Sequence, residues 1–448
     1  MGLRKSATTF LITGLLPVGF LNLARRPRTN AVVLNSSSST SNAAPMSDVD
    51  VVEGHNLLLA MDLDLLCLVL ENLPDARPAW RLISSSKTIR SMLSSMPESA
   101  KPLLHLGPDF KDYGNYNGKH YVSYIGAMAV LKTRTCRVET AVIGRGHVTY
   151  GDVYTDTIDT VDLQVLLQHG PRLKRLVLVN VIILPCTMGF CQHHPLKELT
   201  LVNSSVQPEG NPYCLQRLRE LTSLTHLALH TTDVSSLKAL AGHPSLTSLS
   251  VGGKKWYTCR FSDDEEEEEE AEYVGMPSLS GIYKIPHLRY LDLSEGLEPG
   301  NYNGGFKLIA GKDFGRVGKC QALCTLHIPV CAGDDRYLYY LTRCRNLEKV
   351  VIYQGRDWDE ADGDLVSHDF LCKCRALKHV RSTHSWIADD PEEFFGLLAR
   401  KLARSHPGLM VALPRGANDC PESDDYEAVE DYCRRYRSGD EDEEGEDD

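Results

Sequence analysis

The chain has 448 residues and a formal net charge of -12, but most of that charge lies in three segments. Nine acidic groups lie in residues 263–272 and eight in residues 440–448, while the first 47 residues carry five basic groups and no acidic one, so the remaining body is neutral. A neutral body offers no basic stripe for binding a nucleic-acid backbone. No apolar run reaches the about 18 residues of a membrane helix. With 42% hydrophobic residues, the chain can bury a large core.

Residues 1–45 are predicted to be a targeting-like or disordered leader. They contain five basic residues, the apolar stretch Phe10–Ala24 and the serine run Ser36–Ser39. Acid-poor, Arg-bearing and Ser-rich composition is typical of an organelle transit peptide, whereas an apolar centre is typical of a secretory signal. The alternative is that Met46 is the true start. Without such targeting we expect the cytoplasm or the nucleus, because the scattered cysteines favour a reducing compartment.

Residues 46–100 predict a small all-α module. An apolar face from Leu63 to Leu73 ends at Pro74, and shorter apolar groups follow at 80–83 and 89–93. A terminal element of this kind shields the first core layer of a repeat array. One interpretation is therefore that this module is only a cap.

The rest of the body carries an internal repeat, L-x-x-L-x-L. Successive copies are 22 to 35 residues apart, except for one step of 42 that contains the acidic run. The shortest steps match leucine-rich repeats, in which each unit forms a short strand with alternating burial and neighbouring units stack into one core. The copies begin at Leu173, Leu196, Leu224, Leu246, Leu288, Leu323, Leu347 and, in degenerate form, Leu377.

The segments between these strands predict short return helices at 215–221, 234–241 and 334–344. A further helix is predicted from Pro391, with Asp390 and Glu393 as a capping-box-like pair, and a last strand at 409–413. The predicted fold class is therefore α/β, a leucine-rich repeat solenoid (horseshoe) over 101–415 with an acidic disordered insertion at 260–275. An acidic disordered tail is predicted at 416–448.

The position three residues before each first leucine is predicted to pack at the end of a return helix. Metal ligation is the alternative, above all for the tract Cys186, Cys191, His193 and His194, but paired C-x-x-C units at zinc-finger spacing are absent from the sequence. We therefore predict no metal site. The residues at this position are Gly170, His193, Leu221, His243, Ile285, Cys320, Cys344 and Cys374.

Motifs of catalysis are absent from the sequence. It contains no G-x-S-x-G, H-E-x-x-H, G-x-x-x-x-G-K-[ST] or G-x-G-x-x-G. The nearest approach to a phosphate loop, Gly311 to Lys319, has the wrong spacing, and Cys320 stands in place of the hydroxyl residue. We therefore predict no catalytic residue and no cofactor.

The 46–100 segment resembles an F-box. In that family a short L-P entry precedes a leucine-rich helix, a turn and an end near V-S-[KR]. Met61-Asp62 stands where L-P is expected, and Ser85-Ser86-Lys87 stands at the end. The position immediately ahead of leucine-rich repeats is also similar to F-box proteins, as are the repeats with Cys three residues before Leu.

The resemblance implies a substrate receptor of a cullin–RING (SCF-type) ubiquitin ligase. The F-box-like module would bind a Skp-family adaptor, and through it a cullin, while the repeats would hold a protein substrate. The alternative is an interaction scaffold without a ubiquitin-ligase role. By position, the adaptor-facing or F-box core residues would be Met61, Leu65, Leu66, Leu70, Leu73, Trp80 and Ile83.

A protein partner is expected on the concave face of the repeats. The residues between and after the ladder leucines point there by the period of two along a strand. Aromatic, His and Arg side chains on a rigid sheet are typical of binding hot spots. The predicted partner-binding residues are Arg175, His226, His230, Tyr290, Asp292, His327, Lys349, Tyr353, His379 and Arg381.

Overall fold

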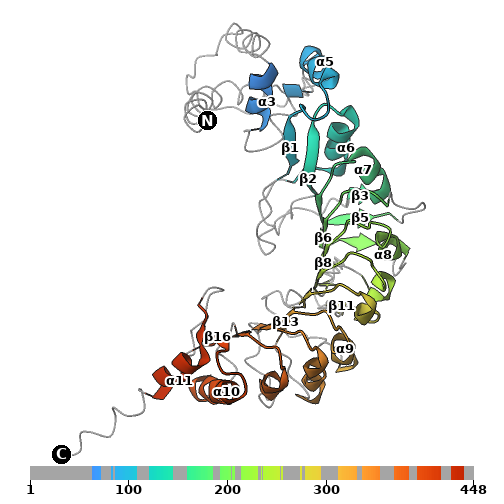
Figure 1. Cartoon of the computed structure of the whole chain (residues 1–448). Coiled ribbons are helices and arrows are strands. Elements are labelled where there is room, and N and C mark those ends of the chain that lie inside the picture. Colours follow the sequence, from blue (N-terminus) through green and yellow to red (C-terminus); the bar gives the residue numbers. More distant parts are fainter. Residues whose placement is uncertain are drawn as a thin grey trace, which may run out of the picture. The chain divides into compact units, whose positions relative to one another are not determined.

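The structure is a computed structural model of the chain, shown in Figure 1. It describes residues 63–71, 82–83, 86–107, 121–144, 159–184, 192–202, 204–206, 213–230, 234, 236–252, 254–255, 273–274, 278–293, 311–329, 335–353, 368–382, 391–414 and 425–437. The leader 1–45, the acidic stretch 263–272 and the acidic end 440–448 lie outside these residues, so the predictions made for them stay predictions.

The chain divides into two compact units, Met1–Ile143 and Gly144–Asp448. The described part of the first unit begins with two helices, each with buried apolar side chains on one face. Ser86 caps the second of them, because its Oγ accepts a hydrogen bond from the Ile89 amide at 3.2 Å. The elements are α3 (Leu63–Glu71), α5 (Lys87–Ser95), β1 (Leu103–Leu106), α6 (Tyr124–Thr133) and β2 (Arg137–Gly144).

Within residues 46–100 the described elements are helices, and the first compact unit continues beyond residue 100, so the predicted module boundary stays a prediction. The first unit reaches Ile143 and contains the parallel pair β1–β2, with Leu103 opposite Arg137. Glu71 at the end of α3 joins the helix to this pair. Its Oε1 accepts a hydrogen bond from the Leu103 amide at 2.9 Å and lies 3.8 Å from Arg137 Nη2. The helices and the strands are therefore one folding unit.

The second unit is a stack of parallel strands in register, one from each predicted repeat. All eight predicted copies form strands, which confirms the leucine-rich repeat prediction for this unit. Leu176, Leu199 and Leu227 pair in sequence, and so do their counterparts along the stack. The strands are β4 (Arg175–Val179), β6 (Glu198–Val202), β8 (His226–His230), β9 (Ser248–Val251), β12 (Tyr290–Asp292), β13 (Thr325–Pro329), β14 (Lys349–Tyr353), β15 (His379–Ser382) and β16 (Met410–Ala412).

The core lies between this sheet and the return segments. Figure 1 shows α7 (Leu163–His169), α8 (Tyr213–Leu218) and α9 (Gly311–Val317) on the same side of the strands. The ladder leucines face them and are almost fully buried. Each strand adds one layer, so every ladder position is covered by two neighbours. The central ladder is Leu176, Leu199, Leu227, Leu249, Leu291, Leu326, Val350, Val380 and Val411.

Several return segments are tighter than an α-helix. The return helices predicted at 234–241 and 334–344 are present, and they are the 3₁₀ helices η1 (Leu237–Leu240) and η4 (Asp335–Arg343). The later returns η2 (Ile282–Lys284) and η5 (His368–Lys373) are also 3₁₀. A 3₁₀ helix rises about 2.0 Å per residue and spans the same gap with fewer residues. The predicted helix from Pro391 is confirmed as α10 (Pro391–Ser405).

The prediction that the end of the chain is a disordered tail from residue 416 is wrong for residues 425–437. There β17 (Glu427–Ala428) pairs antiparallel with β16, and α11 (Val429–Arg437) follows. Tyr432 is 2% exposed, and its hydroxyl donates to the Pro414 carbonyl at 2.8 Å. This buried aromatic anchor closes the last layer of the core, despite the acidic composition around it.

Two small sheets complete the described part of the second unit. β3 (Asp159–Val161), β5 (Val181–Ile183) and β7 (Ser205–Val206) are parallel. β10 (Lys254–Lys255) and β11 (Tyr273–Val274) pair antiparallel, so residues 273–274 of the insertion predicted as disordered are a strand instead.

Candidate partner-binding face

The sheet face away from the return segments, here called the open face, corresponds to the predicted concave face. On each strand the residue before the central ladder leucine and the residue after it point to this side. In-register pairing turns these residues into two rows across the repeats. Within the described residues the first row is Arg175, Glu198, His226, Ser248, Tyr290, Thr325, Lys349, His379 and Met410.

The second row shows which part of the open face is accessible. Val177 on β4 and Val351 on β14 are at most 1% exposed, so the row is packed at both places. Between them, Ala228, Ser250 and His327 retain partial exposure. A partner can therefore reach the face most readily over β8, β9, β12 and β13.

A polar cluster stands at the end of this accessible part. The Tyr290 hydroxyl donates to Asp292 Oδ2 at 3.0 Å and lies 3.4 Å from His327 Nδ1. His327 Nδ1 is 3.5 Å from the same carboxylate oxygen, and the Tyr290 and His327 rings meet edge to face with centroids 5.0 Å apart. Three of the predicted partner-binding residues are therefore brought together into one preorganised group.

The cluster does not assemble a nucleophile and a base. Ser250 pairs with Asp292, and Asp292 pairs with His327, so the carboxylate strand lies between the hydroxyl and the imidazole. Parallel strands are about 4.8 Å apart, which separates Ser250 from His327 by roughly twice that distance. A hydroxyl and its general base must lie within hydrogen-bond reach. The arrangement holds a phenol, a carboxylate and an imidazole in fixed positions.

The carboxyl-terminal end of the open face is occupied by the chain itself. The Tyr426 ring meets His379 edge to face at 5.4 Å, and Lys349 Nζ lies 5.4 Å from the centroid of that ring. Burial, and then the nearby Lys349 and Lys378 charges, lower the pKa of His379. Lys349 and His379 thus pack against β17's own segment, and Arg381 lies beside them on β15.

The remaining predicted partner-binding residues are dispersed. Arg175 forms an ion pair with Glu198 at 3.3 Å on the first strands of the stack, far along the sequence from the cluster. His226 is exposed, whereas His230 is only 3% exposed and belongs to the packed part. The side chain of Tyr353 lies outside the described residues.

Behind the sheet, the position three residues before the first leucine packs as predicted, with one correction. Gly170, Leu221, His243, Ile285 and the three cysteines are buried, but His193 is exposed and its neighbour His194 is the buried residue. His194 Nε2 is 3.0 Å from the Gly170 carbonyl, and its Nδ1 accepts from the Leu196 amide. Sequence spacing missed this shift by one residue, because the preceding tract has no regular period.

The cysteines that the structure describes are all free thiols. Burial raises the pKa of Cys320, Cys344 and Cys374 to about 12, which keeps them protonated and unreactive. The described residues hold no group of His, Cys, Asp or Glu fit for a metal ion, and Cys186 and Cys191 lie outside them.

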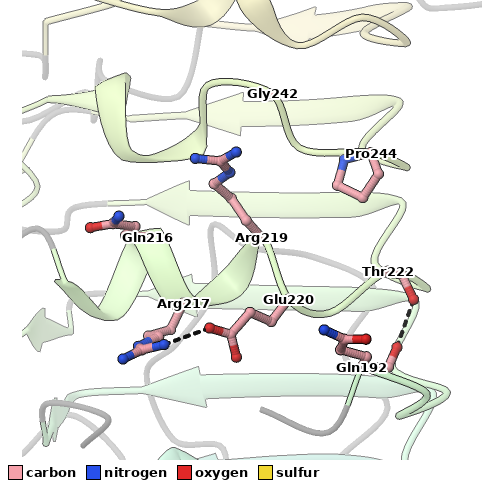
Figure 2. A pocket seen from close by; sticks show the side chains of 8 residues that line it. All are labelled: Gln192, Gln216, Arg217, Arg219, Glu220, Thr222, Gly242 and Pro244. Atoms are coloured by element: carbon pink, nitrogen blue, oxygen red, sulfur yellow. Dashed lines mark hydrogen bonds and ion pairs between the residues drawn. The ribbon is translucent and has the colours of Figure 1, made fainter. Parts of the chain in front are cut away.

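A hollow of about 560 Å³ opens between three consecutive repeats on the side of the return segments. Figure 2 shows Arg217 beside Glu220 on its lining, in an ion pair of 2.7 Å, and Thr222 donating to the Gln192 carbonyl at 2.6 Å. The Thr222 contact joins neighbouring repeats, whereas the Arg217–Glu220 pair lies within one return segment. Its lining residues are Gln192, Gln216, Arg217, Arg219, Glu220, Thr222, Gly242 and Pro244.

In the first unit, the described side chains of the set predicted as adaptor-facing or F-box core lie inside. Leu66, Leu70 and Ile83 are at most 1% exposed, which places them in the core rather than on the surface. Leu68, which the sequence analysis did not select, is exposed on α3. Met61, Leu73 and Trp80 and the side chain of Leu65 lie outside the described residues.

The sequence matches no protein-family model and no curated protein. Among solved structures, an internalin (inlF) from Listeria monocytogenes str. 4b F2365 is 13% identical with a TM-score of 0.32, over 58% of this chain and 60% of that one. An internalin C2 (inlC2) from the same strain is 16% identical with a TM-score of 0.31, over 51% and 77%. This chain thus spans less than two thirds of the first internalin, and such low similarity gives no information about a partner. The repeat assignment depends on the leucine ladder itself.

Within the described part of the chain, no helix combines the length and the apolarity needed to cross a membrane.

Proposed function

We propose that the second unit is a non-catalytic scaffold that binds a protein partner on its open face, over β8 to β13. The observation that carries this proposal is the Tyr290–Asp292–His327 cluster beside a strip of small side chains. Ala228, Ser248 and Ser250 leave space above the sheet, while the cluster offers hydrogen-bonding groups at its edge.

The energetics favour a hot spot at this place. Parallel strands in register are rigid, so a partner orders few side chains on binding. Asp292 is only 8% exposed and already holds the Tyr290 hydroxyl. A buried, preorganised polar group strengthens the bond that it makes to a partner, whereas the dispersed surface charges at Arg175 contribute little.

The test places a photo-crosslinking amino acid at Ser248 in the full chain, with the same residue at Gln216 on the return side as the matched control. We expect Ser248 to yield a discrete crosslinked protein that Tyr290→Ala reduces at least about tenfold, as for a hot-spot residue. Equal crosslinking from both positions, or a product that Tyr290→Ala leaves unchanged, would contradict binding at this face.

We further propose the finer role that the F-box resemblance implies. The first unit would bind a Skp-family adaptor, and the open face would then present a protein substrate to a cullin–RING ubiquitin ligase. The supporting observations are the resemblance of 61–87 and an apolar side chain, Leu68, that α3 exposes. Because Leu66, Leu70 and Ile83 form the core, the adaptor contact belongs to the exposed side of α3.

The experiment is a pull-down of the full chain with a purified Skp-family adaptor. Leu68→Glu should abolish the association, and Ile125→Glu is the matched control, since Ile125 is an exposed apolar residue of α6 in the same unit. If the full chain does not bind the adaptor, the scaffold without a ubiquitin-ligase role remains as the function.

A further inference from the structure

Four exposed cations line up on the return side of the second unit. Lys284, Lys319, Arg343 and Lys373 each stand six residues before the strand of their repeat, and each directly precedes a buried residue of the packing position. Because the strands are parallel and in register, equivalent positions form a row across four consecutive repeats. We call this row the basic ridge.

Tyrosine rings hold the basic ridge together. Lys319 Nζ lies 5.4 Å from the Tyr283 ring of the preceding repeat, and Lys373 Nζ lies 4.4 Å from the Tyr339 ring of the preceding one. Arg343 stacks on Tyr340 at 4.9 Å within its own repeat. These cation–π contacts fix the stems of long side chains while their charged heads stay exposed.

The charge of the ridge is not neutralised by the described residues. None of its four cations forms an ion pair with a described carboxylate, although Asp313 and Asp369 lie on the same return segments. Those two acids are engaged by Arg316 and Lys401 instead. Arg345 and Arg375, each two residues after a ridge cation, are exposed and add positive charge.

We propose that the basic ridge binds an acidic, extended segment of a partner protein. A row of cations with one charge per repeat complements a chain of carboxylates, and cations held in place lose less entropy on binding than free lysines. Single-stranded nucleic acid fits less well, because base stacking needs open ring faces and the ridge cations cover the rings. This surface lies on the opposite side of the sheet from the open face and does not depend on the function proposed for that face.

The acidic run of this chain, 263–272, is the competing occupant. It is bounded by β10 and β11, which follow the carboxyl end of β9, whereas the ridge residues precede the amino ends of their strands. The strands that bound the run and the ridge residues therefore lie at opposite edges of the sheet. A partner in trans is therefore the occupant that we propose, and replacing the run is one arm of the test.

The test measures fluorescence anisotropy of the full chain with a labelled peptide of eight consecutive glutamates flanked by Gly and Ser. The triple variant Lys319→Gln, Arg343→Gln, Lys373→Gln should weaken binding about tenfold, as three exposed ion pairs predict. The matched control Lys197→Gln, Lys238→Gln, Arg404→Gln removes the same charge from exposed cations outside the ridge and should change affinity less than about twofold.

Circular dichroism of both variants checks that the fold persists, and a glutamine version of the peptide should not bind. The proposal is overturned if the full chain does not bind the acidic peptide at low salt, or if both triple variants lose affinity equally. It is also overturned if an oligothymidine of equal charge binds more tightly. If the acidic peptide binds only after residues 263–272 are replaced by Gly and Ser, the ridge is occupied by the chain's own acidic run. That result would overturn the proposal too.

Discussion

The earlier and later repeats of the second unit fill the same structural position with different chemistry. Before β6 and β9 the buried residue is a histidine, His194 or His243, while before β13, β14 and β15 it is a cysteine. His243 and the cysteines lie just after a described return helix, and His194 lies shortly before β6 beside the Gly170 carbonyl of the preceding layer. The comparison shows that one position of the repeat accepts either a hydrogen-bonding histidine or a small cysteine.

The histidines act as clamps between layers. His243 Nε2 donates to the Leu218 carbonyl at 3.2 Å, while its Nδ1 accepts from the Ser245 and Leu246 amides. Both nitrogens are therefore used by the neutral ring, and a second proton would remove the acceptor. Burial is the main cause that lowers the pKa of His243, and it does the same for His194.

The cysteines make weaker hydrogen bonds at this position. Cys344 Sγ donates to the Val317 carbonyl of the preceding layer at 3.2 Å, and Cys374 Sγ donates to the Phe370 carbonyl at 3.5 Å. A thiol is a weak donor, so its contribution comes chiefly from filling space. The earlier repeats are thus sensitive to protonation, and the later repeats are not sensitive at this position.

The largest expected effect tests whether the two halves share one core. Leu227→Ala and Leu326→Ala each remove a nearly fully buried ladder side chain, one from each half. Each should lower the free energy of unfolding by about 2–5 kcal/mol, because the rigid layers cannot collapse into the cavity. Urea unfolding measures both, and a cost below about 1 kcal/mol in either half would contradict a continuous ladder.

The second expected effect concerns pH. A histidine whose pKa is lowered by folding binds fewer protons in the folded chain than in the unfolded chain, so its stabilisation is complete above the unfolded pKa of about 6.5. It is lost as the pH falls below that value. Thermal unfolding between pH 8 and 5 should therefore show falling stability, and hydrogen exchange should locate the loss in β6 to β9.

His243→Leu is the variant for this test. It should cost about 1–3 kcal/mol at pH 8, since it leaves the Leu218 carbonyl and two amides without their partner, and it should flatten the pH dependence. Leu221→Ala, at the equivalent position of the intervening repeat, is the control that lowers stability without changing the pH slope. An unchanged slope in His243→Leu would refute the clamp.

The third effect concerns the thiols. With a pKa of about 12, Cys344 has almost no thiolate at neutral pH, so iodoacetamide should modify it only in the unfolded chain. The half-buried Cys372 should react faster, and it serves as the internal control. Mass spectrometry after timed alkylation measures both rates, and equal rates would contradict the packing of Cys344.

The smallest effect lies at the surface. Arg175→Ala breaks the half-exposed ion pair with Glu198 and should change the free energy of unfolding by less than about 1 kcal/mol, because solvent screens both charges. The contribution that this ion pair makes to the salt dependence of the free energy of unfolding should be absent from the variant. A larger loss, measured by urea unfolding, would mean that Arg175 has a structural role beyond the pair.

The leucine spacing predicted the strand of every repeat, because a period of two and a repeat of regular length leave one way to bury the leucines. The same regularity predicted the packing position, including His243 and all three cysteines. It failed at His194, where the irregular tract before Leu196 shifts the buried histidine by one residue. It also did not predict the pairing of Leu103 with Arg137, because these segments are too far apart for local periodicity to relate them.

By itself, then, the sequence determined the repeat fold, the order of its layers and the candidate residues on the open face. Only the tertiary structure decided which of those residues act together. Tyr290 and Asp292 lie on β12, and His327 lies on β13 of the next repeat. Parallel pairing of the two strands in register brings the three side chains into contact. Strand pairing also places Tyr426 against Lys349 and His379. Here the antiparallel strand β17 carries the end of the chain back to β16. Local patterns specify burial, whereas contacts between distant residues depend on how the layers stack.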